Sequence, residues 1–230
     1  MNGATREWTV TSRCSVLKPT DWLAVRSPDR VRELGEVFTP EKEVQDILDL
    51  FEDINYASRF LEPGCGSGNF LVEILNRKLQ MVVRLPEVSS SIKSKNFSEF
   101  EFKSVITLGS IYGIDIDEVN ILEAKERLFE DFKAFYKSTT KQDLPAYFEK
   151  IVLTILSRNV ILGDMLQGAE KIEIYQYSEL PMNKIKQRVF RFSDLVFPED
   201  EVFEDNDMLF GHVPVQLRDL PAISYKEIGE

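Results

Sequence analysis

The sequence has few of the residues that build disulfide frameworks and metal sites. Its 230 residues include two cysteines, Cys14 and Cys65, and a single histidine, His212. Two widely separated cysteines form no disulfide framework and are typical of a reducing compartment. Structural zinc sites draw on more Cys and His ligands than this chain supplies. We therefore expect a cytoplasmic protein without a metal site.

Long apolar runs and excess basic charge are also missing. No run of about 18 apolar residues occurs, and the N-terminus lacks an apolar core of the signal-peptide type, so we expect no membrane contact. Lys and Arg number 28 against 39 Asp and Glu, which gives a net charge of -11. Such an acidic chain has no overall field that attracts nucleic acid. DNA binding would need a local basic patch, such as residues 183–191, or a partner chain.

The residues that are present favour a globular fold with a large core. Hydrophobic residues make up 43% of the chain, and sixteen of them are Phe. Three parts are expected along the chain: an N-terminal helical arm over 1–35, a central domain over 36–180 and a C-terminal extension over 181–230. The extension contains an acidic loop near residues 198–207.

Strand and helix patterns alternate in the central part. Short apolar strands are predicted at 58–63, 111–117 and 159–164, and amphipathic helices between them. Residues 84–96 are polar with a Ser run, which indicates a loop. Upstream, Thr39 is expected to cap a helix that begins at Pro40. This order predicts an α/β fold with a mostly parallel sheet covered by helices on both faces.

The tail has a different pattern. Residues 171–177 and 188–197 alternate between apolar and polar positions, and no long helix separates them. Alternation of this kind predicts strands with one buried face. We therefore expect a β-rich C-terminal tail.

A glycine-rich turn connects the first strand to its helix. The stretch "RFLEPGCGSGNFLVEIL", residues 59–75, places Gly64, Gly66 and Gly68 at alternate positions. Glycine permits positive φ and close approach of a ligand to backbone, and ligands of open parallel sheets bind at such strand–helix turns. The G-x-G-x-G spacing differs from the G-x-G-x-x-G of dinucleotide folds, which argues against a nicotinamide dehydrogenase.

Two further strands end in acids that suit a nucleoside ligand. In "YGIDID", Asp115 stands at the end of the expected strand, where a carboxylate can accept both ribose hydroxyls. Asp117, the last residue of this stretch, is placed to cap the next helix. Asp164 ends "NVILGD", where it can accept an adenine amino group. Taken alone, each of these patterns, and "GEVFTP" at residues 35–40, also fits a plain turn or a helix cap.

Together the four stretches resemble the cofactor motifs of a known family. In identity, order and spacing, "GEVFTP", "LEPGCGSGNFL", "YGIDID" and "NVILGD" are similar to those of the class I S-adenosylmethionine-dependent methyltransferases. Within that class, the chain resembles the N6-adenine DNA methyltransferases, the M subunits of restriction–modification systems. The resemblance covers residues 30–166 and implies a Rossmann-like fold and S-adenosylmethionine as cofactor.

The resemblance also assigns roles to individual residues around this cofactor. Phe38, Thr39 and Pro40 would line its methionine end. The methionine moiety and sulfonium would be surrounded by Glu62, Gly64, Gly66 and Gly68. Asp115 would bind the ribose, Ile116 would pack on the adenine, and Asp164 with Met165 would flank the adenine edge. A cationic cofactor without phosphate suits a pocket lined by acids.

The family's catalytic motif, Asp, Asn or Ser followed by Pro-Pro and Tyr or Phe, has no counterpart here, because no Pro-Pro occurs in the chain. Tyr177 and Ser178 stand near the expected place with the wrong spacing, and an ordinary strand explains them better. No catalytic residue is therefore assigned. Two functions stay open: methyl transfer to a nucleic-acid adenine, with a partner subunit of a restriction–modification or defence system, or a non-catalytic subunit or regulator acting through protein contacts.

Overall fold

A computed structural model describes residues 39–52, 54–196 and 216–230. The predicted N-terminal arm, Phe38 and the acidic stretch lie outside these residues. All the described residues belong to one unit of the chain, Thr39–Glu230.

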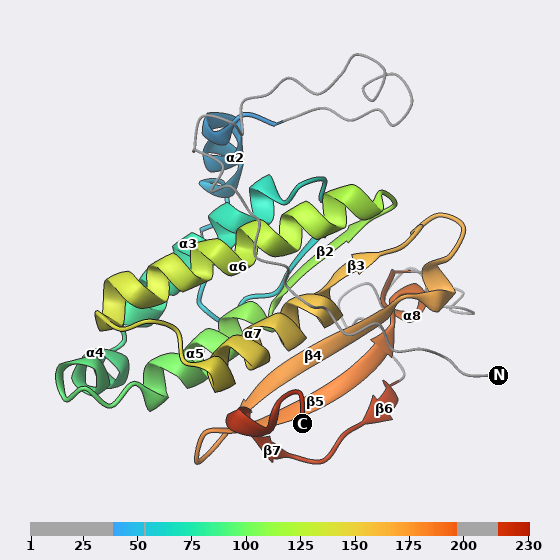
Figure 1. Ribbon diagram of the computed structural model, residues 1–230. Coiled ribbons are helices and arrows are strands. Elements are labelled where there is room, and N and C mark those ends of the chain that lie inside the picture. The colour runs from blue at the N-terminus through green and yellow to red at the C-terminus, as the bar shows by residue number, and fades with distance from the viewer. Residues whose placement is uncertain (1–38, 53, 197–215) are drawn as a thin grey trace, which may run out of the picture. The chain divides into compact units, whose positions relative to one another are not determined.

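A three-stranded parallel sheet lies at the centre of this unit (Figure 1). Its strands β1 (Phe60–Pro63), β2 (Ile111–Asp115) and β3 (Val160–Leu162) are neighbours in that order. Leu61 lies opposite Tyr112, and Ile114 lies opposite Ile161. These strands are the three that the sequence predicts, and the parallel pairing confirms an α/β arrangement, which is compatible with a Rossmann-like fold.

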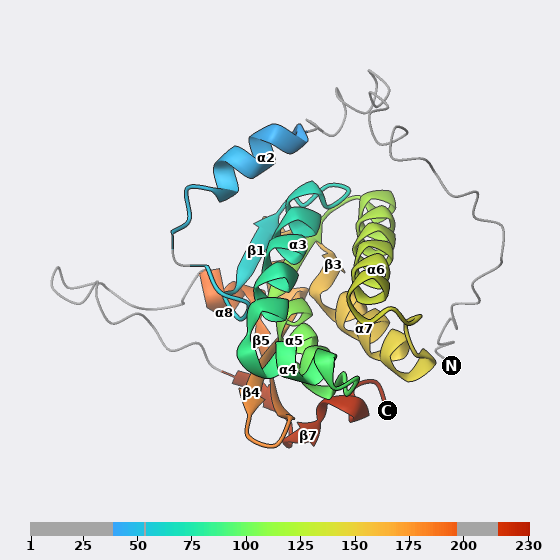
Figure 2. The ribbon, with the colours of Figure 1, turned by 90° about the vertical axis from the view of Figure 1, so that its left-hand side faces the viewer.

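Helices make all the connections between these strands. The helices are α2 (Glu41–Leu48) before β1, then α3 (Asn69–Arg84), α4 (Pro86–Lys93) and α5 (Ser98–Leu108) before β2, and α6 (Glu118–Thr140) and α7 (Ala146–Asn159) before β3. In α3, Leu71, Ile74, Leu75 and Leu79 are buried, as their helical spacing predicts. Helices α3 and α6 pack against each other, as Figure 2 shows.

The two faces of the sheet have different cover. On one face, Gly113 in the centre of β2 lets α3 approach closely, since a Cβ there would lie 2.5 Å from Leu71 Cδ1. On the opposite face, the side chains of Tyr112 and Ile114 pack against Ile172, Ile174 and other residues that follow β3. The central strand β2 is therefore buried on both sides, whereas Leu61 of β1 and Leu162 of β3 are partly exposed.

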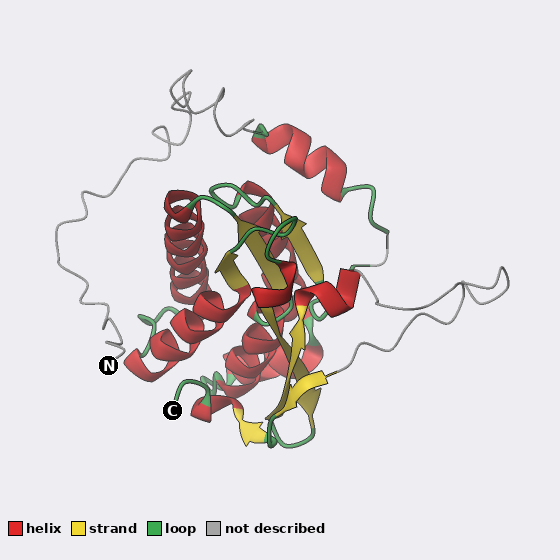
Figure 3. Cartoon of the chain, turned by 90° about the vertical axis from the view of Figure 1, so that its right-hand side faces the viewer, coloured by secondary structure: helices red, strands yellow, loops and turns green. Residues whose placement is uncertain are grey.

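The C-terminal part forms a second, antiparallel sheet (Figure 3). It contains β4 (Glu173–Leu180), β5 (Lys184–Arg191), β6 (Gln216–Asp219) and β7 (Ile223–Ser224), with the short helices η2 (Ala169–Lys171), α8 (Phe192–Val196) and η3 (Tyr225–Glu227) beside them. The alternating tail pattern thus does form strands. The segment 188–197, expected to be strand throughout, turns into helix α8 after Arg191.

Two local expectations are wrong. Most of residues 84–96, expected to be a loop, are helix α4 (Pro86–Lys93): Pro86 begins it, Val88 is fully buried, and the hydroxyl of Ser90 donates to the Pro86 carbonyl. Serine is compatible with helix when its hydroxyl bonds back to the preceding turn in this way. At α2, Pro40 occupies the N-cap position, and no side chain caps the helix, so the expected Thr39 cap does not form.

A buried carboxylate ties the C-terminal segment to the helices. Glu101 of α5 is 3% exposed and accepts hydrogen bonds from the hydroxyls of Tyr136, Tyr147 and Tyr225. These tyrosines come from α6, α7 and η3, respectively. Three donors satisfy a carboxylate that burial would otherwise destabilise, and they anchor η3 to the helical layer.

Lys78 of α3 gives the fold a measurable pH dependence. Its side chain is fully buried, and its Nζ donates to the Ser58 carbonyl at 2.7 Å and to the Ser110 hydroxyl. Burial lowers the pKa of Lys78 to about 7. Between pH 7 and the unfolded lysine pKa of about 10.4, the unfolded chain therefore holds a proton that the folded chain releases. The free energy of unfolding should rise with pH by about 1 kcal/mol per unit.

Chemical denaturation between pH 7 and about 7.5, about one unit below the ordinary cysteine pKa of about 8.5, tests this expectation. Lys78→Met should remove most of the slope, whatever its effect on absolute stability, and the remainder would come from Lys125, whose pKa burial also lowers. Lys137→Met, which removes an exposed lysine paired with Asp143, should leave the slope unchanged. The same slope in Lys78→Met and in the unmodified chain would show that Lys78 is not its source.

Candidate functional site

The glycine turn is fastened onto the carboxyl end of β2. The backbone N–H groups of Gly64 and Cys65 both donate to the Ile114 carbonyl, at 2.8 and 2.9 Å. Gly64, Gly66 and Gly68 all have positive φ, of 73°, 52° and 87°, a region that side chains with a Cβ rarely adopt. A Cβ on Gly64 or Gly66 would meet nothing within 4 Å. The turn therefore has the conformation and the open space that close approach of a ligand requires.

Asp115 connects this turn to the second strand. Its carboxyl group is buried, and Oδ2 accepts the Gly66 N–H at 2.8 Å. Oδ1 accepts the Asp117 N–H at 2.8 Å. Asn120 Nδ2 also donates to Oδ1, at 3.5 Å. An ionised carboxylate has about four acceptor positions, so the second position on Oδ2 is the one that retains capacity for a ligand hydroxyl. As the sequence predicts, Asp117 caps α6 by accepting the Val119 N–H at 2.8 Å.

An exposed apolar side chain and a third acid lie at the ends of the neighbouring strands. Ile116, directly after Asp115, is 64% exposed. The backbone of Gly163 donates to the Asp115 carbonyl at 2.9 Å, which joins the two strand ends. Asp164 follows, and its Oδ1 accepts the N–H groups of Leu166 and Gln167 at 2.8 and 3.0 Å. The Asp164 carboxylate therefore orders its own turn through Oδ1.

Met165 is placed less favourably for ligand contact. Its side chain is partly buried against the apolar cluster that contains Tyr112 and Ile114. It therefore helps to hold the segment after β3 against the sheet.

Two ionisable groups at the turn, Glu62 and Cys65, have pKa values that burial raises. Burial raises the pKa of the Glu62 carboxyl above its ordinary value. The pKa of the Cys65 thiol is raised to about 12, first by burial and then by the charges of Asp115 and Glu62. The thiol is therefore protonated at neutral pH and unsuited to act as a nucleophile. A bound cation would instead favour the ionised form of Glu62.

Three polar residues support the turn from outside. Arg127 of α6 donates from Nη1 to the Ser67 carbonyl and to Asn69 Oδ1, both at 2.7 Å. Asn69 Nδ2 donates in turn to the Thr39 carbonyl at 3.1 Å. The segment that contains Thr39 and Pro40 is thus brought to the glycine turn. Asn69 lies in the glycine-rich stretch, but no sequence pattern singles out Arg127, which stands about 60 residues away on another helix.

Tyr177 and Ser178 lie away from this edge, in the middle of β4. Tyr177 pairs with Gln187 and Ser178 with Lys186 in the antiparallel sheet. The Tyr177 ring is 5% exposed and packs on Gly109, where a Cβ would lie 2.6 Å from Tyr177 Cδ2. A ring enclosed in this way cannot stack on an incoming base. The interpretation of this stretch as an ordinary strand is therefore preferred.

No cluster of three or more metal-ligating side chains occurs within residues 39–52, 54–196 and 216–230. In the same residues, no helix has both the length and the apolar character that crossing a bilayer requires.

The fold and this edge together define an α/β protein with a glycine turn and strand-end acids. No protein-family model matches the chain, and no solved structure matches it. One curated protein of Methanocaldococcus jannaschii is similar, with 30% identity over 99 residues. It is named "Putative type II restriction enzyme and methyltransferase RM.MjaORFECS2P". The matched part is 42% of this chain and 8% of that protein, so the chain corresponds to a small fraction of the relative's length.

Proposed function

We propose that the region 36–180 is a methyltransferase-like domain that binds S-adenosylmethionine at the carboxyl edge of β1, β2 and β3. The hydrogen bond from the Gly66 N–H to Asp115 Oδ2 carries this proposal, because it joins the glycine turn to the acid that would bind the ribose. The open space at Gly64 and Gly66 supports it. The name of the M. jannaschii relative supports a link to restriction–modification.

The residues present fit the chemistry of this cofactor. The Asp115 carboxylate would accept a ribose hydroxyl, the exposed Ile116 side chain would cover the adenine, and the second oxygen of Asp164 would accept the adenine amino group. Thr39 and Pro40 would border the methionine end, with Met165 behind the adenine edge. When bound, S-adenosylmethionine supplies a methyl group on a positively charged sulfur.

A substitution of Glu62 tests whether its carboxylate recognises the positive charge of the cofactor's sulfonium. S-adenosylmethionine carries a sulfonium cation that its demethylated product, S-adenosylhomocysteine, lacks. If Glu62 faces the sulfonium, Glu62→Gln should weaken binding of S-adenosylmethionine by about tenfold and binding of S-adenosylhomocysteine much less. Calorimetric titrations of both ligands measure the ratio. An equal loss for the two ligands would place Glu62 away from the sulfonium.

Methyl transfer to a nucleic-acid adenine is the activity we propose for this domain, in the manner of the N6-adenine DNA methyltransferases. The acidic chain argues for a partner subunit that contributes DNA recognition. In methyltransferases of this type the target base leaves the helix and enters the active site. The chain's own contribution would be to hold and orient the methyl donor.

The second candidate is a non-catalytic subunit or regulator that keeps the fold and acts through protein contacts. It is favoured by the lack of Pro-Pro and by the burial of Tyr177 within β4. Incubation with methyl-labelled cofactor and adenine-rich DNA or RNA, with and without the products of neighbouring genes, separates the two candidates. Methyl incorporation that disappears with Asp115→Ala supports the enzyme. No incorporation under any of these conditions, with cofactor binding intact, supports the regulator.

A further inference from the structure

Helix α2 is attached to α3 along most of its length. The buried residues Val44 and Leu48 lie one helical turn apart and form its inner face. Polar contacts fix both ends: Asn69 at the start of α3 donates to the Thr39 carbonyl, and Arg77 contacts Gln45 and Asp49. The earlier contact joins Thr39 to Asn69, and the later one joins Gln45 to Arg77. The two segments therefore run in the same direction, with Thr39 at the glycine turn.

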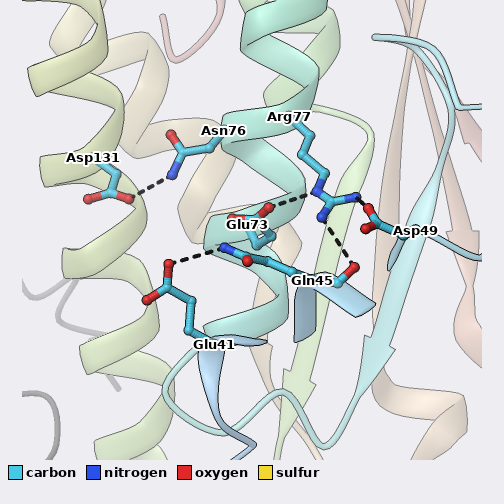
Figure 4. Close-up of polar contacts among 7 residues, drawn as sticks. All are labelled: Glu41, Gln45, Asp49, Glu73, Asn76, Arg77 and Asp131. Atoms are coloured by element: carbon cyan, nitrogen blue, oxygen red, sulfur yellow. Dashed lines mark hydrogen bonds and ion pairs between the residues drawn. The ribbon is translucent and has the colours of Figure 1, made fainter. Parts of the chain in front are cut away.

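Arg77 is the central contact of this attachment (Figure 4). Its Nε donates to Glu73 Oε1 at 2.7 Å, within α3 itself. Nη1 reaches Asp49 Oδ1 at 2.6 Å, and Nη2 donates to the Gln45 carbonyl at 3.2 Å. The guanidinium thus uses three donors in one plane, a geometry that a lysine cannot reproduce. Glu73 fixes the direction of the side chain, and the other two contacts hold the last turns of α2.

The helix needs such support. An isolated helix of eight residues is unstable in water, and Ile47 of α2 is 43% exposed. Asp49, the acceptor on α2, has a side chain that is 67% exposed, whereas that of Arg77 is only 25% exposed. A single enclosed arginine therefore provides the polar contacts at this end of α2.

We propose that Arg77 is a positioning residue for the cofactor site: by clamping α2 to α3 it holds Thr39 and Pro40 over the glycine turn. This inference rests on the proposed function. Arg77 stands about two helical turns from Asn69 and does not itself approach the glycine turn, so its effect passes through α2. If α2 detaches for part of the time, ligand affinity falls in proportion to the attached fraction.

The test combines ligand affinity with local hydrogen exchange. In Arg77→Met, the Kd for S-adenosylhomocysteine should rise about fivefold, and the amides of residues 44–49 should exchange several-fold faster than in the unmodified chain. The amides of β2 should be unaffected, because α2 would open without unfolding the sheet. Asp49→Asn removes the charge of the carboxylate that Arg77 contacts at the end of α2. It should raise the Kd and speed the exchange of residues 44–49 in the same way, by smaller amounts. Arg77→Lys should lie between Arg77→Met and the unmodified chain.

Arg218→Met is the matched control. Arg218 in β6 is also paired with a carboxylate, Glu173, and contacts the Tyr175 hydroxyl, but it belongs to the antiparallel sheet. Its loss should change neither the Kd nor the exchange of α2. An unchanged Kd in Arg77→Met, or a raised Kd without faster exchange in α2, would overturn the role of Arg77. No ligand binding by the unmodified chain would instead overturn the proposed function.

Discussion

Replacing Asp115 by alanine is expected to weaken binding of S-adenosylmethionine by about 100-fold or more. The substitution would remove the acceptor proposed for a ribose hydroxyl, and charge-assisted hydrogen bonds are worth about 1.5–3 kcal/mol each. It would also release the Gly66 N–H and the Asp117 N–H, which Asp115 now accepts. Calorimetric titration of both proteins measures the ratio of the two dissociation constants.

The neighbouring acid provides the matched control. Asp117→Ala removes the α6 cap from the same turn and should cost about 1 kcal/mol of stability, with at most a small change in affinity. Comparable losses of affinity in the two variants would indicate that disturbance of the turn, rather than loss of a ribose contact, explains the Asp115 result. Full affinity in folded Asp115→Ala would remove Asp115 from the site.

The second large effect is a loss of stability that distinguishes Gly68 from Gly64 in the same turn. Gly68→Ala should lower the free energy of unfolding by about 2–4 kcal/mol. Part of this loss comes from the positive φ of 87°, which an alanine adopts only with strain. The rest comes from packing, because the new Cβ would lie 3.0 Å from Ala124 Cβ and 3.3 Å from Ala124 Cα, in a helix that cannot easily shift. Chemical denaturation measures the loss.

Gly64→Ala should behave differently. It carries the strain of a φ of 73°, but its Cβ would enter open space, so about 1–2 kcal/mol of stability should be lost. The methyl group would occupy the space that we propose for the cofactor, and binding should fall at least about tenfold in the folded protein. If Gly64→Ala bound the cofactor with unchanged affinity, the ligand would not approach the turn at this position.

Much of the fold follows from strong local patterns. The three apolar runs that end at Pro63, Asp115 and Leu162 are short and separated by helices, and strands of this kind pair in parallel. The alternating glycines identify the turn, since a positive φ at three alternate positions is readily adopted only by glycine. In the structure, the Gly66 N–H of this turn donates to Asp115 Oδ2, while the role of both residues in binding a ligand stays a prediction.

Other features depend on tertiary contacts that local patterns do not reveal. Helix α4 is rich in serine and was expected to be a loop, but burial of Val88 and a proline start stabilise it. Arg77 and Arg127 resemble any surface arginine in sequence, and only packing of α2, α3 and α6 shows what they hold. The pairing of β5 with β6 joins residues 188–190 to residues 216–219, and the alternating pattern of a strand does not specify such a distant partner.

Binding of the cofactor by the purified chain is the most direct test of the central claim. Calorimetric titration with S-adenosylmethionine and S-adenosylhomocysteine should give saturable heat, one site per chain and dissociation constants in the micromolar range. A nicotinamide dinucleotide, titrated in parallel, should give no heat. Absence of binding by both sulfur ligands, in protein that unfolds cooperatively, would contradict the claim, and binding of the dinucleotide in their place would favour a dehydrogenase.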